Sequence, residues 1–175
     1  MKEFKTIVNA FHAINHAACK TALATVVRVH GSSYRSPGAR MLITDDGKWV
    51  GSISGGCLEG DALRKARQVM LNQKPVTVTY DTREESNQNL GIGLGCNGVI
   101  DVLIEPVDAT KPDNPIHLFS DIILQNKPVL LATACRGKLT GCKLLTDLRG
   151  TTYRNTFDEV TTSLIKPDLA ELAST

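Results

Sequence analysis

Apolar residues recur every three or four positions near the start of the chain, which is the spacing of an amphipathic helix. This pattern predicts a helix over about residues 5–18 that packs one face on the core. Its stripe consists of Phe4, Ile7, Val8, Phe11, Ile14 and Ala18. His12 and His16 would lie one turn apart on this helix, and without an acidic partner beside them we interpret them as solvated residues and not as a metal site.

Extended, β-branched runs follow this helix. Strands are expected over residues 22–30, 41–44 and 49–53, and the sequence Asp45-Asp46-Gly47-Lys48 predicts a hairpin turn between the last two. A second helical stripe, formed by Leu58, Ala62, Ala66, Val69 and Met70, predicts a helix that begins near Cys57. Pro75 then ends this helix before a strand over residues 76–80.

The second half continues the alternation of helices and strands. A nearly continuous apolar run over residues 99–104 is typical of a buried strand. Asn114 is a candidate cap, with Pro115 at the first position, for a helix that buries Ile116, Phe119, Ile122 and Ile123. Further strands are expected over residues 128–133, 143–146 and 151–154, and the pattern weakens beyond Phe157.

These elements predict an α/β fold consisting of a single mixed-sheet domain with flanking helices. We expect this domain to span residues 1–165, followed by a short C-terminal helix or tail over residues 166–175. No internal repeat and no low-complexity linker interrupts it.

Composition narrows the function classes. The 175 residues include 42% hydrophobic and 22% charged residues, enough for one substantial core. The net charge is +2 and basic residues are mixed with acidic ones, so no nucleic-acid surface is indicated. No apolar stretch is long enough to span a bilayer, and the charged N-terminus does not resemble a secretory signal. Five scattered cysteines do not form a disulfide framework, which favours the reducing cytoplasm.

Three glycine-centred segments with polar tips are the most informative local feature of the sequence. They are GSSYRSPGAR at residues 31–40, GSISGGCLEGD at residues 51–61 and GIGLGCNG at residues 91–98. Glycine at this density lets the backbone turn sharply, adopt positive φ or approach a ligand closely. We interpret these segments as the functional part of the molecule.

The first segment brings together cationic and hydroxyl groups. Arg35 and Arg40 bracket a Ser-Pro-Gly turn, and Ser32, Ser33 and Tyr34 precede it. Phosphate or a heteroaromatic ring would suit such a loop. An exposed loop whose arginines pair with surface carboxylates is an equally good interpretation when the segment is taken alone.

The second segment is expected to lead into a helix. Free amides of Gly55, Gly56, Cys57 and Leu58 would point out of the helix N-terminus, where the dipole favours a bound anion and a thiolate at Cys57. The structural alternative is a tight turn with Cys57 as a small buried filler. Glu59 suits the first turn of a helix on either interpretation.

The third segment does not fit a dinucleotide fingerprint. Gly91, Gly93 and Gly95 are too close together, and they lead into a strand and not into a helix. Cys96 could face the same crevice as Cys57. We interpret the other three cysteines as structural, since no C-x-x-C zinc spacing occurs.

The order of the three segments resembles the XdhC/CoxI family of xanthine dehydrogenase accessory proteins. The resemblance rests on G-S-S-x-R-x-x-G-A-x-M at Gly31, S-G-G-C-L-E at Ser54 and G-L-G-C-N-G-V-I-D-V-L-I-E-P at Gly93, and it covers roughly residues 4–106. It implies an N-terminal family domain of a maturation factor that binds the molybdenum cofactor as cargo, assists its sulfuration and inserts it into a xanthine dehydrogenase-type molybdenum hydroxylase. Carried over by motif, the candidate cofactor-binding residues are Ser32, Ser33, Arg35, Gly38, Gly55, Gly56, Cys57, Glu59, Gly95, Cys96 and Gly98.

Two departures from the family pattern stand out. Many members continue into a C-terminal Rossmann domain, and this sequence shows no glycine fingerprint for one. The third motif reads Cys96-Asn97-Gly98 where Cys-Gly-Gly is commoner, although asparagine tolerates left-handed φ better than most residues.

Other functions remain open at the level of sequence. The resemblance favours an accessory factor that is not an enzyme, works as a homodimer and receives sulfur with the help of a cysteine desulfurase. One alternative is a cysteine-dependent enzyme with Cys57 as nucleophile and His30 as the nearest candidate base. Another is a structural dimerisation domain of a split maturation factor.

Overall fold

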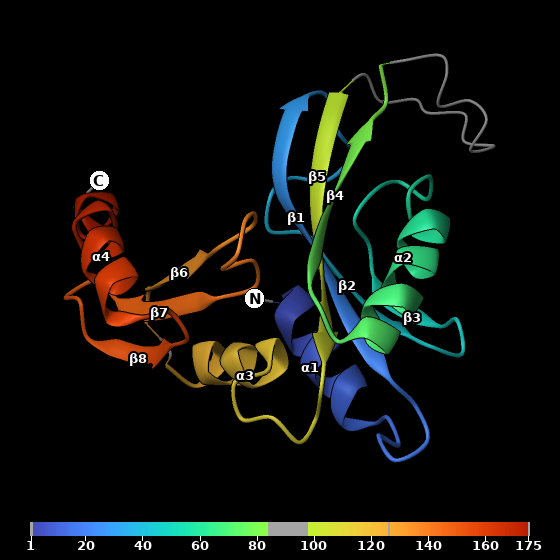
Figure 1. Cartoon of the computed structure of the whole chain (residues 1–175), viewed down its shortest axis with the longest axis horizontal. Coiled ribbons are helices and arrows are strands. Elements are labelled where there is room, and N and C mark those ends of the chain that lie inside the picture. Colours follow the sequence, from blue (N-terminus) through green and yellow to red (C-terminus); the bar gives the residue numbers. More distant parts are fainter. Residues whose placement is uncertain (1, 84–97, 126, 175) are drawn as a thin grey trace.

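The computed structural model describes residues 2–83, 98–125 and 127–174, and its elements alternate between helices and strands (Figure 1). In chain order they are α1 (Lys2–His12), β1 (Thr21–Gly31), β2 (Arg40–Thr44), β3 (Trp49–Gly51), α2 (Glu59–Asn72), β4 (Val76–Asp81), β5 (Gly98–Val107), α3 (Pro115–Gln125), β6 (Val129–Thr133), β7 (Lys143–Asp147), β8 (Thr152–Asn155) and α4 (Glu159–Ala173). The expected α/β fold with flanking helices is confirmed. A single mixed sheet was expected, whereas the strands of the described residues divide between two antiparallel sheets, one of five strands and one of three.

The larger sheet has the strand order β3-β2-β1-β5-β4, with every neighbour antiparallel. Strand β1 is central and pairs with β5 over its whole length, from Thr21 opposite Val107 to Gly31 opposite Gly98. The predicted hairpin between β2 and β3 is confirmed. Gly47 supplies the positive φ of 93° that this turn requires, and its amide donates to the carbonyl of Thr44 at 3.1 Å.

Helix α2 covers one face of the larger sheet (Figure 1). The predicted stripe is confirmed: Ala62, Ala66, Val69 and Met70 are buried against the sheet. The strand residues on this face alternate along β1, β2 and β5, as the two-residue period of a strand requires. They include Ala22, Ala24, Val26, Met41, Ile43, Ile100, Val102 and Ile104.

Helices α1 and α3 pack on the opposite face and form a second apolar cluster. Phe4 of α1 meets Phe119 of α3 edge to face, with the ring centroids 4.8 Å apart. This cluster extends to Leu145 of the smaller sheet, so the two sheets share one core across α1 and α3. The predicted cap of α3 is confirmed, because Asn114 Oδ1 accepts from the amides of Ile116 and His117.

The smaller sheet has the order β6-β7-β8, with α4 alongside it (Figure 1). Its central strand β7 is buried along its whole length. The loop between β6 and β7 reaches the larger sheet, where Lys143 of β7 pairs with Glu105 of β5 and Arg136 of the loop pairs with Asp101. Polar contacts therefore join the two sheets at one side of the shared apolar core.

The first helix differs from its predicted bounds. Helix α1 runs from Lys2 to His12, whereas the apolar spacing predicted residues 5–18. Beyond His12 the chain turns, and Asn15 organises the turn through its carbonyl, which accepts from Ala18 and Cys19 at 3.0 Å each. His16 therefore lies outside the helix, where its Nε2 is 2.9 Å from the carbonyl oxygen of Phe11. The expected placement of two histidines one turn apart on a single helix was wrong.

The C-terminal segment also differs from the expectation. Helix α4 runs without a break from Glu159 to Ala173 and passes through Pro167, so the expected division between residues 165 and 166 falls inside a helix. Asp158 caps the helix, because its side chain accepts from the amide of Thr161 at 2.8 Å. The apolar pattern did not predict this helix because Val160, Leu164 and Leu172 are exposed and form no buried stripe. None of the described helices is both long and apolar enough to span a membrane.

Candidate functional site

The first glycine segment forms the loop that connects β1 to β2. Gly31 and Gly38 stand at its two ends with φ angles of 78° and 94°, which side chains other than glycine rarely adopt. The amide of Gly38 donates to the carbonyl of Val26 at 2.8 Å, which ties the end of the loop back to β1. Within the loop, the hydroxyl of Ser33 accepts from the amide of Arg35 at 3.3 Å.

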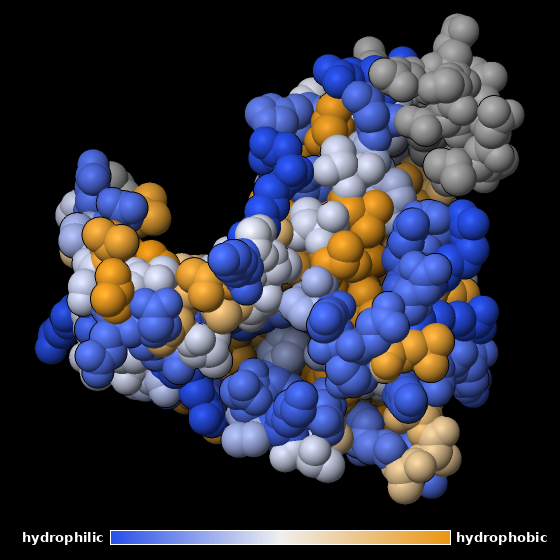
Figure 2. All heavy atoms as spheres, in the orientation of Figure 1, coloured by the Kyte–Doolittle hydropathy of each residue, from blue (hydrophilic) through white to orange (hydrophobic). Residues whose placement is uncertain are grey.

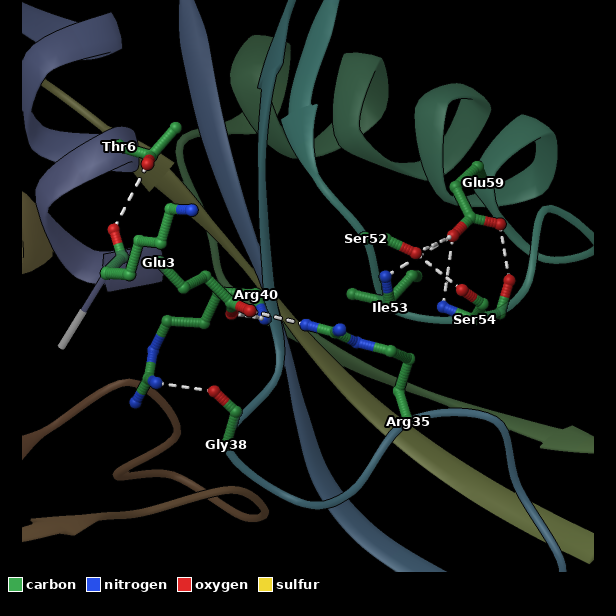
Figure 3. Close-up of polar contacts among 10 residues, drawn as sticks. Glu3, Thr6, Arg35, Gly38, Arg40, Ser52, Ile53, Ser54 and Glu59 are labelled. Atoms are coloured by element: carbon green, nitrogen blue, oxygen red, sulfur yellow. Dashed lines mark hydrogen bonds and ion pairs between the residues drawn. The ribbon is translucent and has the colours of Figure 1, made fainter.

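Arg35 and Arg40 are both anchored to helix α1, on the side of the loop away from α2 (Figure 3). The Arg35 guanidinium pairs with the carboxylate of Glu3, and the other oxygen of that carboxylate accepts from the backbone amide of Arg40 at 2.8 Å. Within the described part of the chain, Nε of Arg35 is buried and makes no hydrogen bond. Nε of Arg40 is buried without a hydrogen bond in the same way, so the contact with Glu3 is what holds both arginines to α1.

Arg40 is a structural residue in this arrangement. Its guanidinium lies 4.6 Å from the ring centroid of Phe4 and 4.8 Å from that of Phe119, two rings of the same apolar cluster. Burial lowers the pKa of Arg40, and the nearby carboxylates of Glu3 and Glu105 act in the opposite direction. Of the two arginines predicted to bracket the loop, Arg35 is the one whose side chain is more available to a ligand.

The second glycine segment is organised around the buried carboxylate of Glu59 (Figure 3). One oxygen accepts from the amides of Ile53 and Ser54, at 3.3 and 3.0 Å, and from the hydroxyl of Ser52 at 2.8 Å. The other accepts from the hydroxyl of Ser54 and from the amide of Leu58. Burial opposes ionisation, but the hydrogen bonds from Ser54 and Ser52 outweigh it and hold the pKa of Glu59 below its usual value.

Two of the amides that the sequence suggested for anion binding are already occupied. Helix α2 begins at Glu59, with Leu58 as its N-cap, so Cys57 lies before the helix. The hydroxyl of Ser54 accepts from the amides of Gly56 and Leu58, at 3.2 and 3.0 Å. The expectation of four free amides is therefore wrong at these two positions, because Ser54 and Glu59 cap the helix from the preceding loop.

Cys57 packs partly buried against the core cluster under α2. In the described residues it makes no hydrogen bond to His30, which is exposed on β1. The pairing of thiol and base that the alternative enzyme hypothesis requires is thus not formed in this structure. No group of three or more His, Cys, Asp or Glu side chains within residues 2–83, 98–125 and 127–174 could hold a metal ion.

The first loop contacts both other segments. The ring of Tyr34 lies against Gly55, where an added Cβ would stand 3.0 Å from Cδ2 of the ring. Gly98 lies against the other end of the loop, where an added Cβ would be 2.5 Å from the carbonyl oxygen of Ser32 and 2.6 Å from that of His30. The first segment therefore meets the second at Gly55 and the last residue of the third at Gly98, and both glycines are required for close approach and not for positive φ.

The rest of the third segment is outside the described residues. Gly95 and Cys96 belong to residues 84–97, so whether Cys96 and Cys57 face one crevice stays a prediction. Gly98 itself begins β5 and is hydrogen-bonded to Thr82, which follows β4. The amide of Gly98 donates to Oγ1 of Thr82 at 2.9 Å, and the carbonyl of Gly98 accepts from the amide of Thr82 at 2.9 Å.

Sequence reasoning missed three residues that shape this region: Glu3, Ser54 and Tyr34. Glu3 lies 32 positions before Arg35, and nothing in the local pattern links them. Ser54 and Glu59 are closer, and a hydroxyl residue shortly before an acidic residue at a helix start is a capping signal that could have been weighed. Tyr34 was noted in the loop, but only the fold reveals that Gly55 supports its ring.

Comparison with known proteins finds similarity to one family. The model of the XdhC and CoxI family matches residues 16–81. The chain is 36% identical over 111 residues to a probable xanthine dehydrogenase subunit of Bacillus subtilis (strain 168), an alignment that covers 63% of this chain and 33% of the relative. It is 30% identical over 90 residues to the molybdenum cofactor insertion chaperone PaoD of Escherichia coli (strain K12), covering 51% of this chain and 27% of that protein.

A solved structure shares the fold. It is described as a xanthine dehydrogenase from Bacillus halodurans, and it matches with a TM-score of 0.71 and 30% sequence identity over 90% of this chain and 46% of its own. The chain thus spans less than half the length of the relatives that it matches. The resemblance to the XdhC and CoxI family indicated by the glycine segments is confirmed, since the model of that family matches residues 16–81.

Proposed function

We propose that this chain is a maturation factor that binds the molybdenum cofactor as cargo and assists its sulfuration and insertion into a xanthine dehydrogenase-type molybdenum hydroxylase. The names of the two relatives, a cofactor insertion chaperone and a xanthine dehydrogenase subunit, support this role. The observation that carries the proposal is the convergence of the glycine segments, in which Tyr34 lies on Gly55 and Gly98 lies on the backbone of Ser32.

The residues present suit a phosphorylated pterin. The guanidinium of Arg35 and the hydroxyls of Ser32 and Ser33 are ligands that a phosphate prefers. The ring of Tyr34 is 63% exposed and rests on Gly55, so it offers a flat face to a heterocycle. The thiol of Cys57 lies in the same second segment and would supply a soft ligand or a sulfur contact.

Other candidate residues hold the two loops in shape. Gly38 and Gly56 adopt φ angles of 94° and 110°, so they shape the two loops through backbone conformation. Glu59 is saturated by donors of its own loop, and we assign it the role of holding that loop in place. Gly95 and Cys96 complete the proposed set from the third segment. The proposal extends to a homodimer in the cytoplasm that meets a cysteine desulfurase as the sulfur source.

The test is a titration of the purified chain, under anaerobic conditions, with molybdenum cofactor released from a donor enzyme. Molybdenum and pterin retained after gel filtration are measured together. Saturable retention is expected, with a loss of at least fivefold in Cys57→Ala and in Arg35→Gln. Cys19→Ala is the matched control, because Cys19 contacts Lys20 and Asp45 at a distance from the three segments.

Each outcome of this titration is informative. Equal retention by Cys57→Ala, Arg35→Gln and the control would contradict the assigned site. No retention by a chain that circular dichroism shows to be folded would contradict cofactor binding by this chain and favour a purely structural assembly domain.

A further inference from the structure

Strand β4 forms an edge of the larger sheet, and among the described residues none pairs with its outer side. Within the part of the chain that the structure describes, β4 pairs with β5 alone. Its register runs without a bulge from Val76 opposite Ile104 to Asp81 opposite Val99. The strand sequence VTVTYD contains no proline or lysine, the residues that commonly block strand addition. The outer backbone edge of β4 is therefore a template for one more strand.

Threonine side chains of β4 make hydrogen bonds to β5 and to the loop between β6 and β7, and these contacts hold the strand in place. The hydroxyl of Thr79 donates to the carboxylate of Asp101 at 2.6 Å, and the hydroxyl of Thr77 donates to the carbonyl of Cys135 in the loop of the smaller sheet. A rigid edge loses little conformational freedom when a strand is added, which favours binding.

A groove of about 720 Å³ runs between β4 and helix α2. Val69 of α2 and Val76 and Val78 of β4 provide its apolar surface. Figure 2 shows hydrophobic residues gathered between these two elements, with hydrophilic residues over α2. An edge strand beside a helix with an apolar groove between them is the arrangement that accepts an extended peptide, since backbone pairing supplies affinity and the groove receives alternate side chains.

The positive charge of the groove favours a peptide that carries acidic residues. Lys65 and Lys74 line the groove, and its lining by described residues includes no acidic side chain. Neither lysine forms an ion pair with a carboxylate of the described residues, whereas Arg64 on the same helix is already paired with Asp61. Two uncompensated cations beside an open strand edge are complementary to carboxylates on the incoming segment.

We propose that an acidic segment of a partner protein binds here in extended conformation, adding to the sheet beside β4 with its carboxylates near Lys65 and Lys74. This interaction surface is separate from the three glycine segments, and the inference does not rest on the proposed function.

The test uses a fluorescein-labelled octapeptide of alternating valine and glutamate, followed by fluorescence anisotropy with the full chain. Saturable binding is expected, together with slower hydrogen exchange at the backbone amides of Val76–Asp81. The double variant Lys65→Glu/Lys74→Glu should bind at least fivefold more weakly. Lys166→Glu on α4 is the matched control for each single substitution, Lys65→Glu or Lys74→Glu, because this exposed residue undergoes the same change from lysine to glutamate far from the groove.

Several results would overturn the proposal. They are the absence of saturable binding, equal binding of an octapeptide of alternating valine and lysine, and unchanged affinity in the double variant. Protection of another edge, such as β6, in place of β4 would also overturn it. Protection of β4 that rises with protein concentration in the absence of peptide would replace the acidic partner by a second copy of this chain.

Discussion

The ring of Tyr34 lies against the backbone of Gly55, so close that a Cβ at Gly55 would stand 3.0 Å from Cδ2 of the ring. Gly55 is not in the left-handed region, so only this contact requires the absence of a side chain. The contact joins two loops that flank separate strands. It also leaves most of the tyrosine ring exposed, as a binding surface requires.

Gly55→Ala is expected to displace the Tyr34 ring at little cost to the fold. Because the ring is exposed and free to swing away, the free energy of unfolding should fall by less than about 1 kcal/mol. Cofactor retention should fall together with the shift of the ring, which the NMR signals of Tyr34 report. Gly60→Ala, at the second residue of α2 and with nothing within 4 Å of the added Cβ, should leave both unchanged or slightly raise stability. A Gly55→Ala variant that retains cofactor like the Gly60→Ala control would contradict the role of Tyr34.

Gly98→Ala should behave in the opposite manner and destabilise the protein strongly. Its Cβ would lie 2.5 Å from the carbonyl oxygen of Ser32 and 2.6 Å from that of His30. These are backbone atoms next to the Gly31 and Gly98 pair of the β1 and β5 ladder, so they cannot move without breaking that pairing. We expect a loss of about 3 kcal/mol in the free energy of unfolding, measured by urea denaturation. A loss as small as that of Gly55→Ala would show that this end of the ladder is not tightly packed.

Local patterns predicted much of this fold because its strands and helices bury regular faces. The stripe from Ala62 to Met70 and the hairpin around Gly47 are fixed by side chains a few residues apart, and both were confirmed. The end of α1 was missed because Ile14 and Ala18 continue the apolar spacing, whereas the bonds of Asn15 turn the chain.

The candidate site was predictable in its segments but not in its contacts. Glycine density located the loops, but the ion pair of Arg35 with Glu3 joins residues 32 positions apart. The amides of Gly56 and Leu58 were expected to be free because the sequence does not reveal that Ser54 folds back on them. Such contacts depend on tertiary structure, and no local periodicity encodes them.

Glu59→Gln tests whether the buried carboxylate holds the second loop. Both lone pairs of the Ser54 hydroxyl are already used by Gly56 and Leu58, so an amide NH₂ in place of the second oxygen would face the Ser54 hydroxyl and the Leu58 amide without an acceptor. We expect a loss of about 2 to 3 kcal/mol in the free energy of unfolding at pH 7. Glu171→Gln, on an exposed turn of α4, should change stability by less than about 0.5 kcal/mol.

The same substitution has a defined pH dependence. The pKa of Glu59 is lower in the folded chain than its ordinary value of 4.5, so the folded state binds this proton less readily than the unfolded state. Its stabilisation is therefore complete well above pH 4.5 and is lost as the pH falls through the folded pKa. Urea denaturation between pH 7 and pH 3 should show a smaller decline in Glu59→Gln than in the unsubstituted chain. Parallel curves would indicate that Glu59 does not contribute to acid sensitivity.

Lys143→Met tests the polar contact between the two sheets. The Lys143 and Glu105 side chains are only 9% and 7% exposed, and the ammonium also donates to the carbonyl of Gly141 at 2.9 Å. Removal of the cation leaves a buried carboxylate unpaired, which is expected to cost about 3 to 5 kcal/mol of stability.

The double variant Lys143→Met/Glu105→Leu separates pairing from packing. A buried ion pair contributes little net stability compared with apolar residues of similar volume, because desolvation of the two charges offsets their attraction. The double variant should therefore recover most of the loss of Lys143→Met, as measured by urea denaturation together with hydrogen exchange at the amides of β7. If the double variant were as unstable as the single one, the loss would come from the packing of Lys143 at this junction and not from an unpaired Glu105.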